Sequence, residues 1–349
     1  MVHHPVISVL TAVYNAEPYL RQCLDSLRDQ TFADCQFICI DDCSTDQSYS
    51  ILQEYAREDS RFQLLRTPVN SGQAKARNLG LQFAKGDYVA MLDADDWFSA
   101  DCLEQAYHAL QQPKVDCAVL QLVQHEQSTH QEAPYLIRDT RTEWSGEEAF
   151  RLSLDWSLHG LYVVRADIHK RFPFDDACRL YSDDNTTRLH YLHSRKVMLC
   201  GGKYFYRKYS DSMTNACTIR RFDYMLANLS MKRQLERLAI SNREEILDFY
   251  EQHRWLNVVG CYWFYYQHRS AFSTSQHEEI HSLFSRILST IESHRLPCSL
   301  KWKLGYYPFL TYACFSRMED FYFAIRSVWF RLSGKDVEGK PHGGNDTSS

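Results

Sequence analysis

The sequence predicts an α/β protein with a mostly parallel sheet, helices on both faces of that sheet, and a helical C-terminal region. Between residues 5 and 120, short β-branched apolar runs alternate with segments of helical periodicity, the pattern of repeated strand–helix units. Residues 220–335 lose the strand-like runs and keep the helical spacing. A length of 349 residues with 44% hydrophobic content is enough for roughly two domains.

The predicted elements of the first part follow one another with short loops. Short apolar runs, the first of them rich in β-branched residues, predict strands at residues 6–14, 36–42, 62–66, 87–93 and 114–124. Helical spacing and capping residues predict helices at residues 16–30, 44–60, 70–86 and 99–112. Strands that alternate with helices pair in parallel, and such sheets bind ligands beyond the carboxyl ends of their strands.

The rest of the chain is less regular and then becomes helical. After a helix expected at residues 144–156, residues 172–215 contain an acidic pair, a helix, a strand and a basic, aromatic turn. The predicted organisation is a first domain at 1–215 with halves at about 1–120 and 121–215, a helical region at 216–335 and a disordered tail at 336–349.

Composition argues against several classes of protein. A net charge of -5 gives no support for nucleic-acid binding. The start has no basic leader, and no window reaches the roughly 20 apolar residues of a membrane-spanning helix, so we expect a cytoplasmic protein. The 12 cysteines are then expected to be reduced, and a metal site at Cys35, Cys39 and Cys43 is disfavoured because no CxxC pair exists.

Three carboxylates, Asp93, Asp95 and Asp96, follow the fourth predicted strand directly. Acids at a helix start interact favourably with the helix dipole, which accounts for one or two of them. That explanation fits Asp93 poorly, because it ends a buried strand, where an unpaired carboxylate is costly. A divalent cation, Mg²⁺ or Mn²⁺, held by one or two carboxylates and by phosphate oxygens, accounts for the group.

Polar residues elsewhere allow two interpretations each. Asp42 in IDDCSTD is either a turn residue or an acceptor for a ribose hydroxyl or base N–H. Lys75 and Arg77 in NSGQAKARN either lie on a solvated helix start or face a diphosphate. Asp183 and Asp184 in YSDDNTTRLHY are either helix caps or include a general base. Together, these groups predict glycosyl transfer from a nucleotide-sugar, with the cation stabilising the leaving diphosphate.

The segments PVISVLTAVYNAEPYLRQCLDSLRDQTF, FICIDDCSTDQS and LLRTPVNSGQAKARNLGLQFAKGDYVAMLDADDWF resemble the start of family 2 glycosyltransferases. These enzymes have the GT-A fold, a Rossmann-like fold that binds nucleotide-sugars. Four motifs occur in order over roughly the first 110 residues. Residues 172–215 are similar, more loosely, to the acceptor half of bacterial polysaccharide transferases.

The resemblance implies an activity. It is the inverting, metal-dependent transfer of a hexosyl or N-acetylhexosaminyl group, with a UDP-sugar as the expected donor. The acceptor would be a hydroxyl of a glycan or lipid-linked glycan in bacterial capsule, exopolysaccharide or lipopolysaccharide synthesis.

The resemblance also implies roles for donor-binding residues. Tyr14 would stack near the base, and Asp42 would contact the base or ribose. Arg77 would lie near the nucleotide, beside Lys75. Arg207, in YFYRKYSDS, would reach the diphosphate from a mobile loop.

The resemblance also implies roles for two acidic motifs. Asp93 and Asp95 would form the family's DxD motif, with Asp95 the direct metal ligand and Asp96 in support. The family has Glu-Asp where this chain has Asp183-Asp184, and its second acid is the base. The base is therefore expected to be Asp184, with Asp183 as the alternative.

Residues 299–335 are rich in aromatic residues and carry six Lys and Arg residues. Either their helices pack aromatic side chains on the first domain, or the segment from about 300 to 335 contacts an anionic lipid surface. In the second case the protein would be peripheral at the inner face of the plasma membrane.

Two rival functions remain open from the sequence alone. A nucleotidyltransferase would also use acids, a metal and a nucleotide, but it usually has a Gly-rich basic loop after the first strand. This chain has YNAEPYL there instead. A non-catalytic module that binds nucleotide-sugars would not need Asp93, Asp95 and Asp184 together. The sequence does not predict the oligomeric state.

Overall fold

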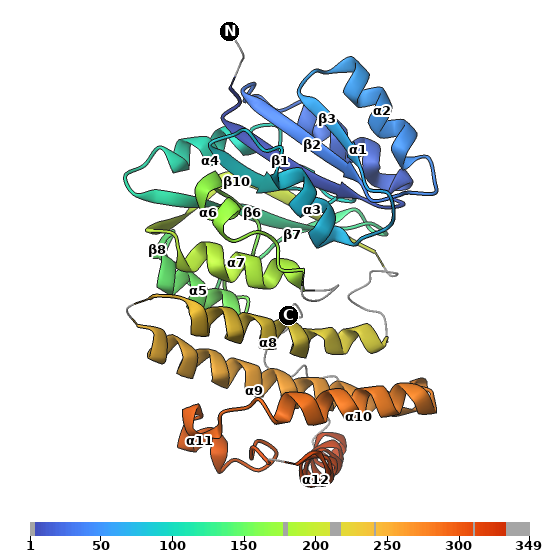
Figure 1. Ribbon diagram of the computed structural model, residues 1–349, viewed down its shortest axis with the longest axis vertical. Coiled ribbons are helices and arrows are strands. Elements are labelled where there is room, and N and C mark those ends of the chain that lie inside the picture. Colours follow the sequence, from blue (N-terminus) through green and yellow to red (C-terminus); the bar gives the residue numbers. More distant parts are fainter. Residues whose placement is uncertain (1–3, 177–180, 210–217, 241, 310, 333–349) are drawn as a thin grey trace. The chain divides into compact units, whose positions relative to one another are not determined.

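The structure, a computed structural model, describes residues 4–176, 181–209, 218–240, 242–309 and 311–332 (Figure 1). It divides into two compact units, Met1–Ser212 and Met213–Ser349. The expected subdivision of the first domain near residue 120 stays a prediction.

The first unit is built on a ten-stranded mixed sheet. Its main path has the order β3-β2-β1-β4-β9-β6-β10-β5, while β7 pairs with β6 and β8 pairs with β10. The strands are β1 (Ile7–Val13), β2 (Cys35–Asp41), β3 (Phe62–Arg66), β4 (Tyr88–Met91), β5 (Trp97–Phe98), β6 (Val115–Glu126), β7 (Gln131–Pro134), β8 (Glu143–Ser145), β9 (Tyr162–Arg165) and β10 (Lys196–Lys208).

Strands β1 to β4 are parallel, as expected from the alternating pattern. The sequence did not predict β9, which runs antiparallel to both β4 and β6 at the centre of the sheet. This strand has four residues and is followed at once by a helix, so it shows no strand periodicity of its own.

Helices cover both faces of this sheet, which confirms the predicted fold class. Alternate residues of β1 and β2 point to opposite faces: Val9 and Phe37 pack with α1, α2 and α4, whereas Leu10 and Ile38 pack with α3 and α6. The helices are α1 (Glu17–Arg28), α2 (Ser48–Glu58), α3 (Gln73–Leu81), α4 (Cys102–Leu110), α5 (Gly146–Leu154), α6 (Ala166–Arg171) and α7 (Ser182–Leu192).

The second unit is helical, as the loss of strand-like runs predicted. Its α-helices are α8 (Asp223–Arg237), α9 (Arg243–His268), α10 (Thr274–Leu288), α11 (Cys298–Lys301) and α12 (Tyr312–Leu332), and its 3-10 helices are η1 (Ile219–Phe222), η2 (Arg269–Ala271) and η3 (Ser293–Arg295). Helices α8 and α9 run side by side (Figure 1). Aromatic side chains dominate its core, among them Phe222, Trp255 and Tyr262. None of the helices within the described ranges has the length and apolar character needed to cross a bilayer.

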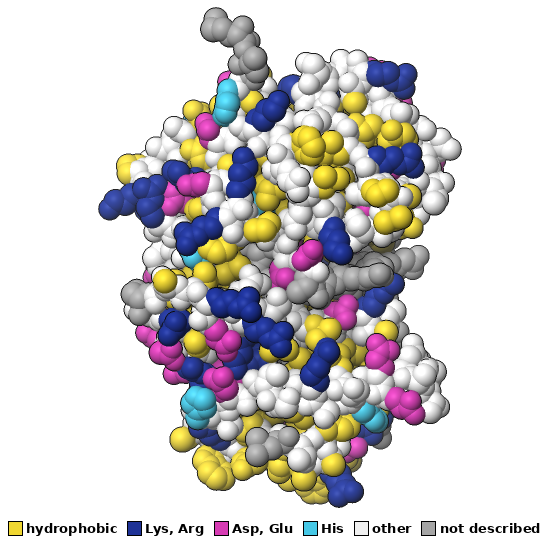
Figure 2. All heavy atoms as spheres, in the orientation of Figure 1, with side chains coloured by type: hydrophobic (Ala, Val, Ile, Leu, Met, Phe, Trp, Pro, Cys, Tyr) yellow, Lys and Arg dark blue, Asp and Glu magenta, His cyan; other side chains and the backbone are white. Residues whose placement is uncertain are grey.

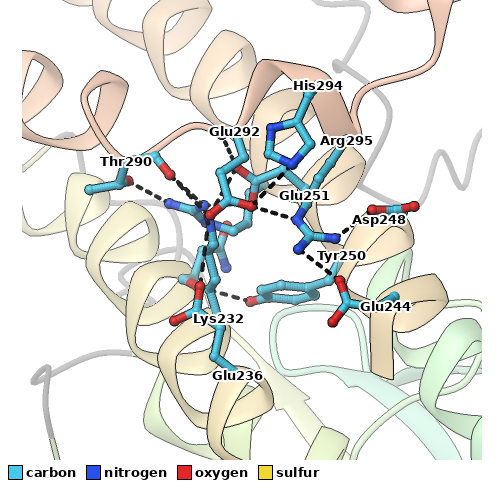
Figure 3. Close-up of polar contacts among 12 residues, drawn as sticks. Lys232, Glu236, Glu244, Asp248, Tyr250, Glu251, Thr290, Glu292, His294 and Arg295 are labelled. Atoms are coloured by element: carbon cyan, nitrogen blue, oxygen red, sulfur yellow. Dashed lines mark hydrogen bonds and ion pairs between the residues drawn. The ribbon is translucent and has the colours of Figure 1, made fainter. Parts of the chain in front are cut away.

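A buried ionic network ties α8, α9 and the 290–295 segment together (Figure 3). Glu251, 1% exposed, accepts hydrogen bonds from Lys232 Nζ at 3.4 Å and Arg254 Nη1 at 2.6 Å. Lys232 Nζ also lies 3.1 Å from Glu292 Oε1, and Glu292 accepts a hydrogen bond from Arg295 Nε. Each buried charge therefore has an opposite charge within hydrogen-bonding reach, the condition under which burial is tolerated.

Candidate active site

The acidic turn after β4 holds the three predicted carboxylates in different environments. Asp96 is almost fully buried, and both of its oxygens are occupied: Tyr204 Oη donates to Oδ2 at 2.7 Å and the Arg207 backbone N–H donates to Oδ1 at 2.8 Å. Burial, followed by the charges of Asp93 and Asp95, raises its pKa well above the usual value. Asp96 therefore anchors the turn to β10 and offers no free oxygen.

Asp93 and Asp95 each keep one oxygen that no hydrogen bond from another described residue reaches. Asp93 Oδ1 accepts from Gln73 Nε2 at 2.8 Å and from Arg77 Nη2, while Asp95 Oδ2 accepts from Tyr209 Oη at 2.9 Å. This leaves Asp93 Oδ2 and Asp95 Oδ1 as hard oxygen donors. Burial and the charge of Asp93 raise the pKa of Asp95, so a cation there would relieve an existing repulsion.

Two carboxylate oxygens fit the donor set of Mg²⁺ or Mn²⁺, which retains water and phosphate oxygens as its other ligands. Within the described residues, no group of three or more His, Cys, Asp or Glu side chains is arranged to hold a metal ion. A cation at this turn would therefore depend on oxygens that a ligand or water supplies.

Arg207 corrects an expectation. It lies in strand β10, not in a mobile loop, and the turn expected around it is part of that strand. Its guanidinium donates to Asp95 O at 2.8 Å, to Gln22 Oε1 at 2.6 Å and to Gln127 Oε1. The main-chain carbonyl of Asp95 is thereby held by a nearly buried cation, so Arg207 supports the acidic turn.

Aromatic rings that the sequence did not single out enclose this arginine. Its guanidinium carbon lies 4.9 Å from the ring centroid of Tyr19 and 4.7 Å from that of Trp97. Tyr209 in turn stacks on Tyr19 with ring centroids 5.6 Å apart. Tyr209 follows Arg207 by two residues in YFYRKYSDS, so the motif that drew attention to the arginine also contained the tyrosine.

Asp42 organises the loop that leads to α3. Its carboxylate accepts hydrogen bonds from Thr67 Oγ1 at 2.7 Å, from the Ser71 backbone N–H at 2.9 Å and hydroxyl at 2.8 Å, and from Gly72 N at 2.7 Å. Burial alone would raise its pKa, but these hydrogen bonds outweigh burial and lower it. Gly72 has φ 91°, a left-handed conformation that favours glycine.

The structure separates Lys75 from Arg77. Arg77 is 1% exposed and lies against Asp93, with its guanidinium carbon 5.3 Å from the Phe174 ring centroid. Its Nε and Nη1 have no hydrogen-bond partner within the described part of the chain. Lys75 is two positions away, about 200° around the helix, and is exposed. Arg77 thus joins the acidic turn and Lys75 does not.

The first strand ends in an exposed aromatic ring. Tyr14 is 48% exposed, which leaves its ring available to a ligand. The next residue, Asn15, has φ 49° and its Oδ1 accepts a 2.8 Å hydrogen bond from Thr45 N. This contact joins the loop after β1 to the loop after β2.

The second acidic pair lies at the start of α7, and its two members have different neighbours. Burial raises the pKa of Asp183. The positive charge of Arg77 opposes this rise in pKa, whereas the negative charge of Asp93 adds to it. Asp184 is nearly buried, with its Oδ2 3.9 Å from Arg188 Nη2. Burial raises the pKa of Asp184 to about 8, although Arg188 opposes the shift. Asp183 is therefore the member whose charge interacts with the acidic turn.

Comparison with known proteins shows which sequences the chain is similar to. Residues 8–166 match the family model described as "Glycosyl transferase family 2". An uncharacterized glycosyltransferase of Haemophilus influenzae is 46% identical over 101 residues, which are 29% of this chain and 40% of that protein. The glycosyltransferase GlyG of Streptococcus pneumoniae is 25% identical over 219 residues, 60% of this chain and 72% of that protein. The chain therefore spans less than half the length of the first of these relatives.

Solved structures show the same fold. The crystal structure of S. aureus TarS 1-349 in complex with UDP-GlcNAc superposes with a TM-score of 0.72 at 17% sequence identity, over 97% of this chain and 99% of that one. The likeness covers both the sheet and the helical region. It establishes the GT-A fold.

Proposed function

We propose that the protein, whose residues 8–166 match the family model "Glycosyl transferase family 2", transfers a sugar from a nucleotide-sugar to a glycan or lipid-linked glycan. The transferred group would be a hexosyl or N-acetylhexosaminyl group, and a UDP-sugar is the preferred candidate donor because the TarS neighbour binds UDP-GlcNAc. The poly(ribitol-phosphate) beta-glucosyltransferase of Bacillus spizizenii, 39% identical over 105 residues, supports a bacterial polymer as the setting. We place the reaction in the cytoplasm, where nucleotide-sugars are available.

The observation that carries the proposal is the arrangement around Asp93. Its Oδ1 is held by Arg77 and Gln73 at the start of α3, and its other oxygen remains available. The same arginine interacts electrostatically with Asp183. Asp93, the buried Arg77 and Asp183 thus interact electrostatically although they come from distant parts of the chain, which supports the proposal.

Asp93 and Asp95 would hold Mg²⁺ or Mn²⁺, which when bound supplies positive charge against a nucleoside diphosphate leaving group. Tyr14 would stack on the base, and Asp42 would shape the loop beside it. Arg77 would offer its unpartnered N–H groups to the donor. Contacts of Lys75 and Arg207 with the donor stay predictions.

Asp184 would act as the general base. An acceptor hydroxyl has a very high pKa, so its proton must leave as the new bond forms. A carboxylate with a pKa near 8 is poised for this role. Attack opposite the leaving group with one base would invert the anomeric carbon.

Product analysis tests this function against its rivals. A thermal-shift screen of UDP-, GDP- and dTDP-sugars with Mn²⁺ first identifies the donor, since a ligand bound by the native state raises the melting temperature. The chosen donor is then incubated with the protein, and the nucleotide product is identified. We expect release of the nucleoside diphosphate. Release of pyrophosphate would instead indicate a nucleotidyltransferase, and binding without any product would indicate a non-catalytic module.

A further inference from the structure

Helix α12 has two apolar faces, and only one of them is buried in its own unit. Phe315 and Phe323 belong to the core of the second unit. The opposite side of the helix carries large apolar side chains at helical spacing that remain about half exposed: Phe321 58%, Ile325 48%, Val328 56% and Trp329 56%. Contiguous exposed apolar residues of this kind mark interaction sites in soluble domains.

The turn after α11 adds to this exposed face. Its side chains Trp302, Leu304 and Tyr307 are 77%, 52% and 41% exposed. The turn lies against α12 at Tyr322: Gly305 has φ 77°, and a Cβ there would meet the Tyr322 ring at 2.2 Å. We call these seven exposed residues the aromatic surface: Trp302, Leu304, Tyr307, Phe321, Ile325, Val328 and Trp329. Figure 2 shows hydrophobic side chains gathered over α11 and α12.

Basic residues are interleaved with the aromatic surface. Lys301 and Lys303 alternate with Trp302 and Leu304, and exposed Arg317 precedes Phe321 by one helical turn. The two acids of this region do not offset these positive charges at the surface, because Glu319 is fully buried and Asp320 pairs with Arg269. Residues 299–335 contain six Lys and Arg residues and two acids, a net charge of +4, in a chain whose net charge is -5.

This charge pattern favours one occupant of the surface. Residues 333–349 have Val337 as their one large apolar side chain, so they offer no apolar face to cover it. Two copies of the chain would bring like charges together. An anionic bilayer instead matches both the basic and the aromatic residues of the surface. Its phosphates attract Lys and Arg, and its interfacial region accommodates aromatic rings.

We propose that the aromatic surface docks on an anionic lipid bilayer. The apolar stripe of α12 and the 302–307 turn would enter the headgroup region, with Lys301, Lys303 and Arg317 against lipid phosphates. The proposal does not rest on the proposed function, because it concerns the second unit alone.

Vesicle flotation of the full chain tests the apolar component. We expect the wild type to float with vesicles that contain phosphatidylglycerol, and to float much less with pure phosphatidylcholine. The double variant Ile325→Glu/Val328→Glu changes side chains that are exposed, so it should fold and lose flotation at least tenfold. Leu136→Glu, at a position 75% exposed in the first unit, is the matched control and should float like the wild type.

Charge-reversal variants test the electrostatic attraction between the aromatic surface and anionic vesicles. Lys301→Glu/Lys303→Glu should reduce binding to anionic vesicles by roughly tenfold or more, since each basic residue near the surface contributes to attraction. Lys85→Glu, an exposed lysine of the first unit, should leave binding unchanged. Wild-type binding should also weaken between about 0.1 and 0.5 M salt, because the attraction is screened.

Three results would overturn the proposal. The first is no flotation of the wild type with either lipid. The second is flotation that Ile325→Glu/Val328→Glu leaves unchanged. The third is a wild-type dimer, detected by light scattering, that the same double variant dissociates while vesicles bind neither protein; this would assign the surface to a second copy. Donor turnover with a water-soluble acceptor is measured in parallel, so that failure of docking is distinguished from failure of the enzyme.

Discussion

At the scale of single residues, the three carboxylates after β4 differ in what their oxygens already bind. Asp96 uses both oxygens within the protein, whereas Asp95 uses one, for Tyr209. Spacing in the sequence predicted the acidic group, and the family resemblance implied a supporting role for Asp96, but neither identified its partners. The partners of Asp96 lie 108 and 111 residues further along the chain, so only the fold reveals them.

Tyr209 is expected to tune the proposed metal site through Asp95. Tyr209→Phe removes one hydroxyl that orients the carboxylate and keeps the ring that stacks on Tyr19. Loss of such an outer contact typically weakens metal binding by about tenfold or more. Titration of Mn²⁺ in the presence of the donor measures the effect, and Tyr49→Phe serves as the control. Equal affinity in wild type and Tyr209→Phe would contradict this role.

The proposed base should leave a signature in the pH profile. With a pKa of about 8, Asp184 is mostly protonated at neutral pH, and a base works only when deprotonated. We expect kcat/KM to rise about tenfold per pH unit below 8 and to level off above it.

Variants of the acidic pair assign the base. Asp184→Asn should lose about 10²-fold to 10⁴-fold in activity and abolish the pH dependence, while donor binding persists. Asp183→Asn is the paired comparison. If Asp183→Asn alone lost activity and the pH dependence, the base would be Asp183, whose charge interacts with Arg77 and Asp93.

At the scale of elements, the periodicity of apolar residues predicted the helices and the buried strands. It did not predict strands that form only because neighbouring strands pair with them. Strand β9 is four residues long, and its pairing on both sides makes it a strand. The region around Arg207 was predicted as a turn because basic and aromatic residues alternate there. Its ladder of backbone pairs with β6, from Lys203 to Lys208, extends the strand instead.

The ionic network in the second unit should be costly to break. Glu251→Gln removes the charge that faces Lys232 and Arg254, both nearly buried. Lys232 would keep Glu292, but Arg254 would lose its acidic partner, and leaving a buried cation unpaired typically costs about 3–5 kcal/mol. Urea unfolding measures the loss, with Glu278→Gln at an exposed position of α10 as the control. A loss below about 1 kcal/mol would contradict the cost expected for an unpaired Arg254.

Substitution of Glu319 on α12 is expected to have the opposite effect to that of Glu251: it should stabilise the fold at high pH. Glu319 is fully buried, neither carboxyl oxygen has a hydrogen-bond partner among the described residues, and burial raises its pKa to about 8. Since the folded pKa lies above the unfolded one, folding binds a proton, and stability falls as pH rises from about 4.5 to 8.

Substitution of Glu319 tests that dependence. Glu319→Gln should be more stable than the wild type at pH 9, and the difference should shrink at pH 5, where both side chains are neutral in the fold. Thermal unfolding at the two pH values measures it. Identical differences at both pH values would mean that the carboxyl group does not titrate in this range.

At the scale of the whole molecule, the GT-A fold was predictable because strands, helices and motifs of the first 110 residues occur in order. Those motifs lie at strand ends, and a parallel sheet brings such ends to one edge whatever the details of packing. The acidic pair of α7 was harder to place, since its approach to Arg77 depends on the long connection through β9. The aromatic composition of the last helix was evident, whereas its second exposed face required the structure.

The central claim is that Asp93 and Asp95 bind a divalent cation together with the nucleotide-sugar. Isothermal titration calorimetry with the donor from the thermal-shift screen, with and without Mn²⁺, tests it most directly. We predict that Mn²⁺ raises donor affinity about tenfold or more in the wild type, and equally in Asp87→Asn, at the opposite end of β4. It should have no effect in Asp95→Asn. The same enhancement in Asp95→Asn, or none in the wild type, would contradict the claim.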